Sequence, residues 1–333
     1  MQDQPLLEVS GLRVAFPTAR GYVEAVRGVD FSLRKGEIMS LVGESGSGKS
    51  ITMRAVMGLL PPAALARGSV KLLGRELMGI EEKEIRRLRG SRMSMIFQDP
   101  LTALNPVLTV GDQLTEAIRI HQPRISPKEA RERAIELFRS VAIPYPEKRM
   151  DQYPHEFSGG MRQRVVIAIA IANRPDLIIA DEPTTALDVT VQAQVLELLS
   201  ELCRVNNTGL VLITHDLGVV AGMAEKVSVM YAGSIVERST VDDLFEHPRH
   251  PYTRGLLGSL PQMTGDIGRL SDIGGAPPTA ATIPAGCAFN PRCDYAVDRC
   301  RTETPALETY GPTHVACHLA HTLPEYAEQR KTA

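Results

Sequence analysis

The stretch "GEIMSLVGESGSGKSITMRAVMG", residues 36–58, decides the fold of this chain. An apolar run at residues 38–42 predicts a buried strand, and a helical pattern follows residue 50. Between them, residues 43–50 have the spacing Gly-x-x-x-x-Gly-Lys-Ser of a phosphate-binding loop, in the strand–loop–helix context that such a loop requires. A glycine-rich turn with a chance Lys-Ser pair would not explain this context, so the sequence predicts a phosphate site here.

The residue types of this loop suit polyphosphate chemistry. Glycines let the backbone wrap closely around phosphates, so that N–H groups and a helix N-terminus face the anion. Lys49 supplies a charge for the β- and γ-phosphates, and the Ser50 hydroxyl is placed to bind Mg²⁺. The predicted nucleotide contacts in this segment are Gly43, Ser45, Gly46, Gly48, Lys49, Ser50 and Ile51.

A second acidic motif lies in "RPDLIIADEPTTALD", residues 174–188. Four apolar residues predict a buried central strand that ends in Asp181 and Glu182. Carboxylates at the C-terminal end of a parallel strand lie where open α/β sheets bind ligands. One can hold Mg²⁺ and the next can activate water. Alone, such a pair would more often be a solvated strand end; beside a phosphate loop in the same chain it predicts a catalytic site.

Length and composition set limits on the class of protein. The chain has 333 residues, 37 Lys and Arg against 39 Asp and Glu, and 43% hydrophobic residues, which is typical of a folded globular protein with no overall preference for nucleic acid. Its longest apolar run, residues 165–172, is far shorter than a membrane-spanning helix needs. The N-terminal residues lack the pattern of a signal peptide. We therefore expect a cytosolic chain that reaches a membrane only through partners.

Four further motifs resemble those of the ATP-binding-cassette (ABC) ATPases. "EFSGGMRQRVVIAIAIANRPDLIIADEP" at 156–183 is similar to the signature and catalytic-strand segment, and "MIFQDPLTALNP" at 95–106 to the Q-loop with Gln98. "TTALD" supplies the D-loop ending at Asp188, and "LVLITHDLGVV" supplies the switch histidine, His215. All occur in the order that the family has.

The resemblance narrows to one branch of that family. "QDPLTALNP", "VMYAGSIVE" and "LFEHPRHPYTRGLLGSLP" resemble the ATPases of oligopeptide, dipeptide and nickel importers, which carry a C-terminal extension with a cysteine-bearing segment. The match covers roughly residues 6–319. It implies an ABC ATPase domain over 1–235 and an extension over 236–333 with its four-cysteine segment at 287–317.

The same resemblance implies the architecture of the ATPase domain. We expect an α/β phosphate-loop NTPase core with a mostly parallel sheet flanked by helices, an N-terminal antiparallel β-subdomain, and a helical subdomain inserted at about 100–158. "SPKEARERAIELFRSV", residues 126–141, has helical periodicity with a Ser-Pro start, which fits that insertion.

Two positions depart from the usual family pattern. The signature begins with Phe157 and ends with Met161, where the commonest form has Leu and Gln, although Ser158, Gly159 and Gly160 are intact. For the aromatic ring that stacks on adenine, the resemblance points to Phe16. Tyr22 is the alternative, and Phe16 would then belong to the core.

The resemblance also implies a mechanism in which two ATPase domains face head to tail. ATP would lie between the phosphate loop of one and the signature residues 158–161 of the other. Glu182 would orient and deprotonate water, while Lys49 and His215 stabilise charge on the phosphoryl group. Ser50, Gln98 and Asp181 would surround Mg²⁺. Without the family motifs, His215 would be read as a core histidine.

Partners follow from the same resemblance. We expect a second, homologous ATPase subunit, with a homodimer as the alternative, two membrane permease subunits and, indirectly, an extracytoplasmic solute-binding protein. The chain would then work peripherally on the cytoplasmic face of the cell membrane. Dipeptides, oligopeptides, nickel complexes and glutathione stay open as substrates. A non-transport ABC ATPase fits less well, because only about sixty residues separate Gln98 from Ser158 and there is one cassette.

Four of the five cysteines lie close together near the C-terminus, at Cys287, Cys293, Cys300 and Cys317. A cytosolic setting disfavours disulfides, and the spacing matches neither common zinc knuckles nor bacterial ferredoxins. Unligated thiols or zinc, with His314 or His318 as substitute ligands, are therefore open. The family resemblance favours a [4Fe–4S] cluster. Cys203 lies in a helical pattern and is expected in the core, and the Gly- and Pro-rich residues 260–286 predict a loop.

Overall fold

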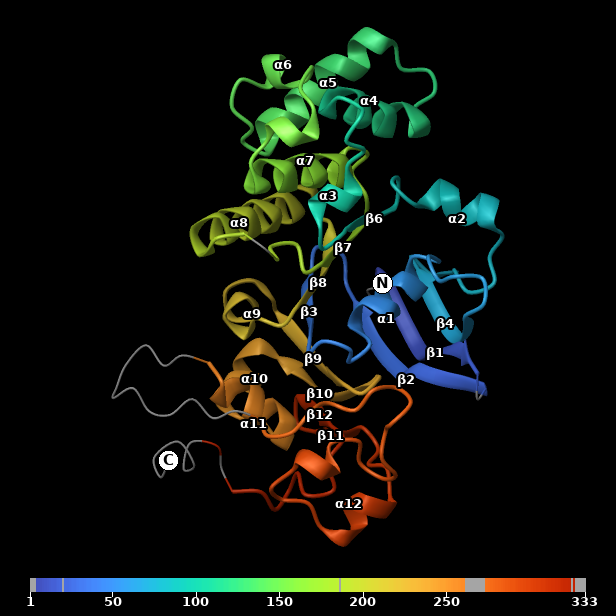
Figure 1. Cartoon of the computed structure of the whole chain (residues 1–333), viewed down its shortest axis with the longest axis vertical. Coiled ribbons are helices and arrows are strands. Elements are labelled where there is room, and N and C mark those ends of the chain that lie inside the picture. The colour runs from blue at the N-terminus through green and yellow to red at the C-terminus, as the bar shows by residue number, and fades with distance from the viewer. Residues whose placement is uncertain (1–3, 20, 186, 261–272, 325, 327–333) are drawn as a thin grey trace. The chain divides into compact units, whose positions relative to one another are not determined.

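The computed structural model of the chain describes residues 4–19, 21–185, 187–260, 273–324 and 326 (Figure 1). The chain folds as two compact units. Unit 1 comprises Met1–Leu7, Leu33–Glu37 and Leu72–Ile213, and unit 2 comprises Glu8–Ser32, Ile38–Lys71 and Thr214–Ala333. Of the helices described, none combines the length and apolar character needed to cross a bilayer.

Unit 1 combines a small parallel sheet with most of the helices. Its elements are β5 (Arg75–Glu76), α2 (Glu82–Leu88), β6 (Met93–Ile96), α3 (Pro100–Ala103), α4 (Val110–His121), α5 (Pro127–Ser140), α6 (Pro146–Arg149), η1 (Pro154–Glu156), α7 (Gly159–Ile171), β7 (Leu177–Asp181), α8 (Val189–Asn206) and β8 (Gly209–Thr214).

Strands β6, β7 and β8 of unit 1 are parallel, and nearly all of their residues are buried. β7 pairs with β6 on one side and with β8 on the other, and every residue of β7 and β8 is buried. A strand buried on both faces must be apolar throughout, which is what the run at residues 177–180 predicts. The predicted catalytic strand is therefore confirmed, and it ends at Asp181 as expected.

Helices α3, α4, α5 and α6 and the short helix η1 lie within the predicted insertion at about 100–158, drawn from teal to green in Figure 1. α5 begins with a capping box: the Ser126 hydroxyl accepts the N–H of Glu129, and the Glu129 carboxylate accepts the N–H of Ser126. Ala130, Ala134 and Phe138 line its buried face at helical spacing. The helix predicted from the Ser-Pro start is confirmed.

Unit 2 contains β1 (Leu7–Thr18), β2 (Gly21–Leu33), β3 (Ile38–Val42), α1 (Lys49–Val56), β4 (Leu65–Leu72), α9 (Leu217–Met223), β9 (Lys226–Tyr231), β10 (Ser234–Thr240), α10 (Val241–Glu246), α11 (Pro251–Gly258), η2 (Asn290–Arg292), α12 (Asp298–Thr302), β11 (Glu308–Tyr310) and β12 (Thr313–Val315). β1 and β2 form a hairpin with β4 beside β1, which confirms the predicted N-terminal β-subdomain.

A second set of strands in unit 2 joins the phosphate-loop strand to the C-terminal extension. β9 pairs in parallel with β3 and antiparallel with β10, which pairs antiparallel with β12, and β12 with β11. The extension thus adds β11 and β12 to strands of the ATPase core. The described part of the predicted loop, 273–286, contains no helix or strand, and residues 261–272 lie outside the described residues.

Candidate nucleotide site and four-cysteine cavity

The phosphate loop joins β3 to α1, as the sequence predicts. Gly43 and Gly48 have φ angles of 148° and 103°, which favour glycine. A Cβ at Gly43 would stand 2.2 Å from the Met230 carbonyl oxygen, and one at Gly48 would stand 2.7 Å from that of Ala25. Neighbouring backbone therefore leaves room only for glycine at both positions, and the loop is fixed by packing as well as by its own sequence.

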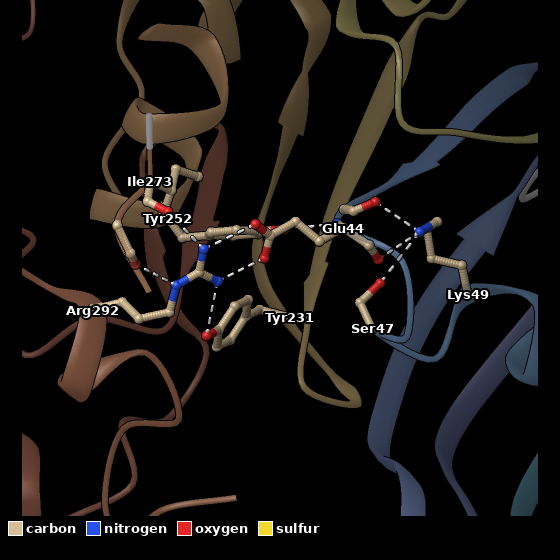
Figure 2. A network of polar contacts seen from close by, with 9 residues as sticks. Glu44, Ser47, Lys49, Tyr231, Tyr252, Ile273 and Arg292 are labelled. Atoms are coloured by element: carbon tan, nitrogen blue, oxygen red, sulfur yellow. Dashed lines mark hydrogen bonds and ion pairs between the residues drawn. The ribbon is translucent and has the colours of Figure 1, made fainter. Parts of the chain in front are cut away.

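The Lys49 ammonium lies buried across the inside of this loop. It donates to the carbonyl oxygens of Gly43 at 2.7 Å and Glu44 at 2.9 Å, and to the Ser47 hydroxyl at 3.4 Å (Figure 2). These contacts hold the ammonium charge at the N-terminus of α1, whose first residues include Ser50 and Ile51. A phosphate bound by the loop would meet this charge and the N-terminal N–H groups of α1.

Glu44 connects the loop to the C-terminal extension, which sequence reasoning missed. Its carboxylate accepts hydrogen bonds from both terminal nitrogens of Arg292, at 2.7 and 3.0 Å, and its backbone N–H donates to the Tyr252 hydroxyl at 2.8 Å. Glu44 occupies a variable position of the phosphate-loop motif, and Arg292 belongs to the cysteine-bearing segment. No local pattern marks either residue as a partner of the other.

In unit 1, the structure places Glu182 directly after β7. Its carboxylate accepts hydrogen bonds from Gln98 Nε2 and Thr185 Oγ1, both at 3.0 Å. Its φ angle is 47°, an uncommon backbone conformation for a residue other than glycine that is often associated with functional sites. Asp181, one residue earlier, is buried at the end of the strand. The structure therefore brings together Glu182, predicted as the catalytic base, and Gln98, predicted to bind Mg²⁺.

The signature and D-loop residues both begin helices of unit 1. Ser158 is the N-cap of α7 and its hydroxyl accepts the N–H of Met161; Gly159 and Gly160 form the first turn. Asp188 is the N-cap of α8 and its carboxylate accepts the N–H of Val191. The prediction that the signature serine opens a helix is confirmed. The N-terminus of α7 offers the N–H groups and positive helix end that favour an anion.

The remaining predicted contacts lie in unit 2. His215 follows β8 immediately, as the apolar run before it predicts. Phe16 lies half-buried in β1, and Tyr22 in β2 is 57% exposed, so which ring stacks on adenine stays a prediction. Ser50 belongs to unit 2, whereas Gln98 and Asp181 belong to unit 1. Their joint binding of Mg²⁺ therefore stays a prediction as well.

The four C-terminal cysteines line one small cavity of unit 2. Phe289, Pro251 and Leu319 supply apolar walls, and the other lining residues are His250, Asn290, His318 and the cysteines Cys287, Cys293, Cys300 and Cys317. His318 thus faces the cavity, whereas His314 lies in β12, paired with Arg238 and Thr309. Cys203 lies apart from this group, buried in α8 of unit 1 as expected, and burial raises its thiol pKa to about 12.

Backbone N–H groups point at three of these sulfurs. Those of Phe289 and Asn290 face Cys287, that of Tyr295 faces Cys293, and that of Leu319 donates to Cys317 Sγ at 3.4 Å. Burial nevertheless dominates, and it raises the pKa of Cys287 and raises those of Cys293 and Cys317 to about 11. Protonated thiols are therefore favoured at neutral pH unless a cation shares the cavity.

Within the described residues, no three His, Cys, Asp or Glu side chains are arranged to hold a single metal ion. The four cysteines can nevertheless share one cavity, because a single ion and a multi-iron cluster require different distances between their sulfur ligands. One zinc ion needs its four sulfurs within about 4 Å of one another, given Zn–S bonds of about 2.3 Å. A multi-iron cluster is larger, and its cysteine sulfurs stand further apart.

Comparison with known proteins covers both parts of the chain. The ABC transporter family matches residues 26–185, and the C-terminal region of oligopeptide/dipeptide transporters matches residues 236–300. A solved structure of the ATP-binding cassette MJ0796, a dimer bound to ADP and Pi, superposes with a TM-score of 0.64 and 26% identity, over 71% of this chain and 98% of that one. This likeness confirms the predicted ABC ATPase fold.

Curated relatives extend the likeness to almost the full length. The chain is 52% identical to the oligopeptide transport ATP-binding protein AppD of Bacillus subtilis, over 94% of this chain and 96% of that one. It is 49% identical to the dipeptide transport ATP-binding protein DppD of Bacillus subtilis, over 97% of both. It is 53% identical to OppD of Mycobacterium tuberculosis over 94% of this chain, but it spans only about half the length of that protein. The chain therefore belongs to the ABC transporter family and, within it, to the oligopeptide and dipeptide transport ATP-binding proteins.

Proposed function

We propose that this chain hydrolyses ATP to drive uptake of dipeptides or oligopeptides through a membrane ABC importer. One observation carries the proposal: an intact phosphate loop, an oriented Glu182 and the C-terminal region of oligopeptide/dipeptide transporters occur in one chain. The relatives that match over almost their full length are named for oligopeptide or dipeptide transport. The same role for nickel complexes, glutathione or another small solute is the second candidate.

The residues of the chain have distinct roles in the proposed reaction. The loop Gly43–Ser50 binds the phosphates, with Lys49 as the cation that balances their charge. Mg²⁺, held by Ser50, Gln98 and Asp181, would neutralise charge on the β- and γ-phosphates. The Glu182 carboxylate, fixed by its two hydrogen bonds, accepts a proton from the attacking water. His215 donates to the γ-phosphate as its charge develops.

The site is completed by a second ATPase domain in this proposal. The signature residues Ser158–Met161 of one domain face the γ-phosphate bound by the other, with Asp188 between the two sites. We propose a homologous but different partner subunit, with a homodimer as the alternative. Two permease subunits receive the motion, so the chain works at the cytoplasmic face of the membrane, and a solute-binding protein outside the membrane delivers the peptide. ATP binding favours the closed pair, and hydrolysis reopens it.

The variant Glu182→Gln tests the proposed catalytic role. It keeps the hydrogen bond from Gln98 or Thr185 but cannot accept the proton, so we expect MgATP binding to persist and turnover to fall about 10²–10⁴-fold. Glu197→Gln, an exposed residue of α8, is the matched control and keeps full activity. Turnover would be measured on the chain with its partner and permease subunits in vesicles, together with uptake of a labelled peptide. Unimpaired hydrolysis by Glu182→Gln would remove Glu182 from this role.

We further propose that Cys287, Cys293, Cys300 and Cys317 hold a [4Fe–4S] cluster. Support comes from their shared cavity and from N–H groups aimed at three of the sulfurs. Hydrogen bonds to the sulfurs are a known means of stabilising such clusters. A bound cluster would also anchor a segment that has little core of its own.

Iron and acid-labile sulfide content test this proposal on protein purified without oxygen. We expect about four of each per chain, a visible charge-transfer band, and loss of both in Cys293→Ser, while Cys203→Ser keeps them. Zinc in place of iron, or metal-free protein that is equally stable, would overturn the cluster. Neither result would affect the proposed ATPase role.

A further inference from the structure

Every N–H group of the Arg292 guanidinium has a partner in unit 2 (Figure 2). Two N–H groups bind the Glu44 carboxylate, at 2.7 and 3.0 Å. Nε donates to the Gly274 carbonyl at 2.9 Å, and the others donate to the Ile273 carbonyl at 3.0 Å and the Tyr231 hydroxyl at 3.4 Å. Because arginine has five donors in a rigid fork, this set fixes both the position and the orientation of the side chain.

The Arg292–Glu44 pair is shielded from water. The side chain of Arg292 is 5% exposed and that of Glu44 is 26% exposed. The guanidinium lies 5.9 Å from the centres of the Tyr231 and Phe289 rings, and these two rings pack edge to face at 5.3 Å. A bidentate ion pair at such low exposure is stronger and less sensitive to salt than a surface pair.

Glu44 is held through three of its groups. Arg292 binds its carboxylate, the Tyr252 hydroxyl accepts from its N–H, and its carbonyl oxygen accepts from Lys49. Two of these partners come from the extension, and the third is the lysine expected to bind phosphate. The extension therefore contacts the residue that shapes the loop around Lys49.

We propose that Arg292 is a positioning residue for ATP binding: it fixes the phosphate loop and neutralises the Glu44 carboxylate next to the site of the nucleotide phosphates. The inference rests on the proposed function in that it assigns ATP to the loop. Without Arg292, the loop would present a carboxylate to an anion of several negative charges, and like charges at short range oppose binding. With Arg292 in place, the positive charge of its guanidinium balances the Glu44 carboxylate, so the glutamate adds no net charge to the loop.

Three substitutions in the full-length chain test this role by the dissociation constant for MgATP at constant salt. Arg292→Gln should weaken MgATP binding by about tenfold or more, because it leaves Glu44 without its cation. Arg292→Lys should fall in between, because lysine keeps the charge but loses the fork. The double variant Arg292→Gln with Glu44→Gln should bind MgATP more tightly than Arg292→Gln alone, because the uncompensated carboxylate is gone.

The recovery in the double variant separates positioning from a purely structural role. If Arg292 only stabilised the extension, a second substitution would not restore affinity, and melting temperatures without nucleotide would follow the affinities. The matched control is Arg301→Gln, which removes an arginine of α12 whose ion pair with Asp298 is exposed. We expect it to bind MgATP as the unchanged chain does.

Two results would overturn the inference. One is Arg292→Gln protein that stays folded and binds MgATP with unchanged affinity, and the other is a double variant no better than Arg292→Gln. If Arg292→Gln does not fold, Arg292→Lys and the double variant still give the comparison. A chain that does not bind MgATP at all would instead contradict the proposed function, so the two failures are distinguishable.

Discussion

Glu237 is a carboxylic acid with no exposed surface, placed on β10 where the register with β9 shifts. Its oxygens accept the N–H groups of Arg249 at 2.7 Å and His250 at 3.0 Å, which holds the start of α11 against the strand. Burial raises its pKa above the ordinary value of 4.5, since the hydrogen bonds compensate only in part. The residue therefore fastens the start of α11 to β10 at a cost that depends on pH.

This buried acid predicts the pH dependence of stability. Between 4.5 and the raised pKa, the folded chain keeps a proton that the unfolded chain has released, so the free energy of unfolding falls as pH rises, by up to about 1.4 kcal/mol per pH unit. Glu237→Gln removes this contribution. His250 acts in the opposite direction below its ordinary pKa of 6.5: burial lowers its pKa to about 3 in the folded chain, so only the unfolded chain binds its proton there, and this contribution cancels when the two proteins are compared.

Denaturant unfolding of both proteins from pH 5 to pH 8 would measure the effect. The stability of the unchanged chain relative to Glu237→Gln should decline with rising pH. If the unchanged chain instead gained stability relative to Glu237→Gln as pH rises, the hydrogen bonds from Arg249 and His250 would outweigh burial and lower the pKa of Glu237.

At the same scale, residues differ in how far sequence could predict them. Lys49, Glu182 and Ser158 belong to motifs in which neighbouring residues report the role, and the structure places each at the strand or helix end expected. Glu44 could not be predicted in this way, because its partner Arg292 lies 248 residues further on. The sequence also could not show that Thr185 holds Glu182, because a threonine after an acidic pair has many other possible contacts.

Among the elements, helix α5 depends on its first turn for stability. Its exposed face is strongly charged, so packing of Ala130, Ala134 and Phe138 and the capping box together define the helix. Ser126→Ala removes the hydroxyl that accepts the N–H of Glu129, and we expect a loss of about 1 kcal/mol in the stability of the helical insertion. Ser140→Ala, at the other end of the same helix, is the control and should change stability by less than about 0.5 kcal/mol.

Hydrogen exchange of the α5 amides would measure this loss where it occurs. Faster exchange in the first turn of Ser126→Ala, with Ser140→Ala unchanged, would show that the cap limits opening. Equal exchange in both variants would mean that packing alone holds the helix.

Elements with strong local signals were therefore predictable: the strand at 38–42, the strand ending at Asp181, and the helices that start after Ser126 and Ser158. β11 and β12 were not, because each has only three residues and is formed by pairing with β10 rather than by its own composition. The convergence of the four cysteines on one cavity also depends on pairing and packing between distant segments, which spacing in sequence does not encode.

For the whole molecule, the compact units do not follow the order of the chain. Unit 2 contains the phosphate loop, the β-subdomain and the C-terminal extension, whereas unit 1 contains Gln98, the signature and Glu182. The extension shares a core with ATPase strands, including Val229 and Tyr231 of β9 with Tyr252 and Phe289. The family matches at 26–185 and 236–300 describe stretches of sequence, and the physical units cut across them.

The ion pair between Glu44 and Arg292 has a consequence for protein engineering. A C-terminal extension transferred from one relative to the ATPase domain of another must supply an arginine that pairs with the glutamate of the recipient's phosphate loop. It must also supply a tyrosine equivalent to Tyr252 that accepts from the backbone of that loop. A graft that matches only one side would leave a buried charge unpaired, however well the two halves fold separately. Whether an extension and an ATPase domain are compatible should therefore be judged from residues 44 and 292 together before the fusion point is chosen.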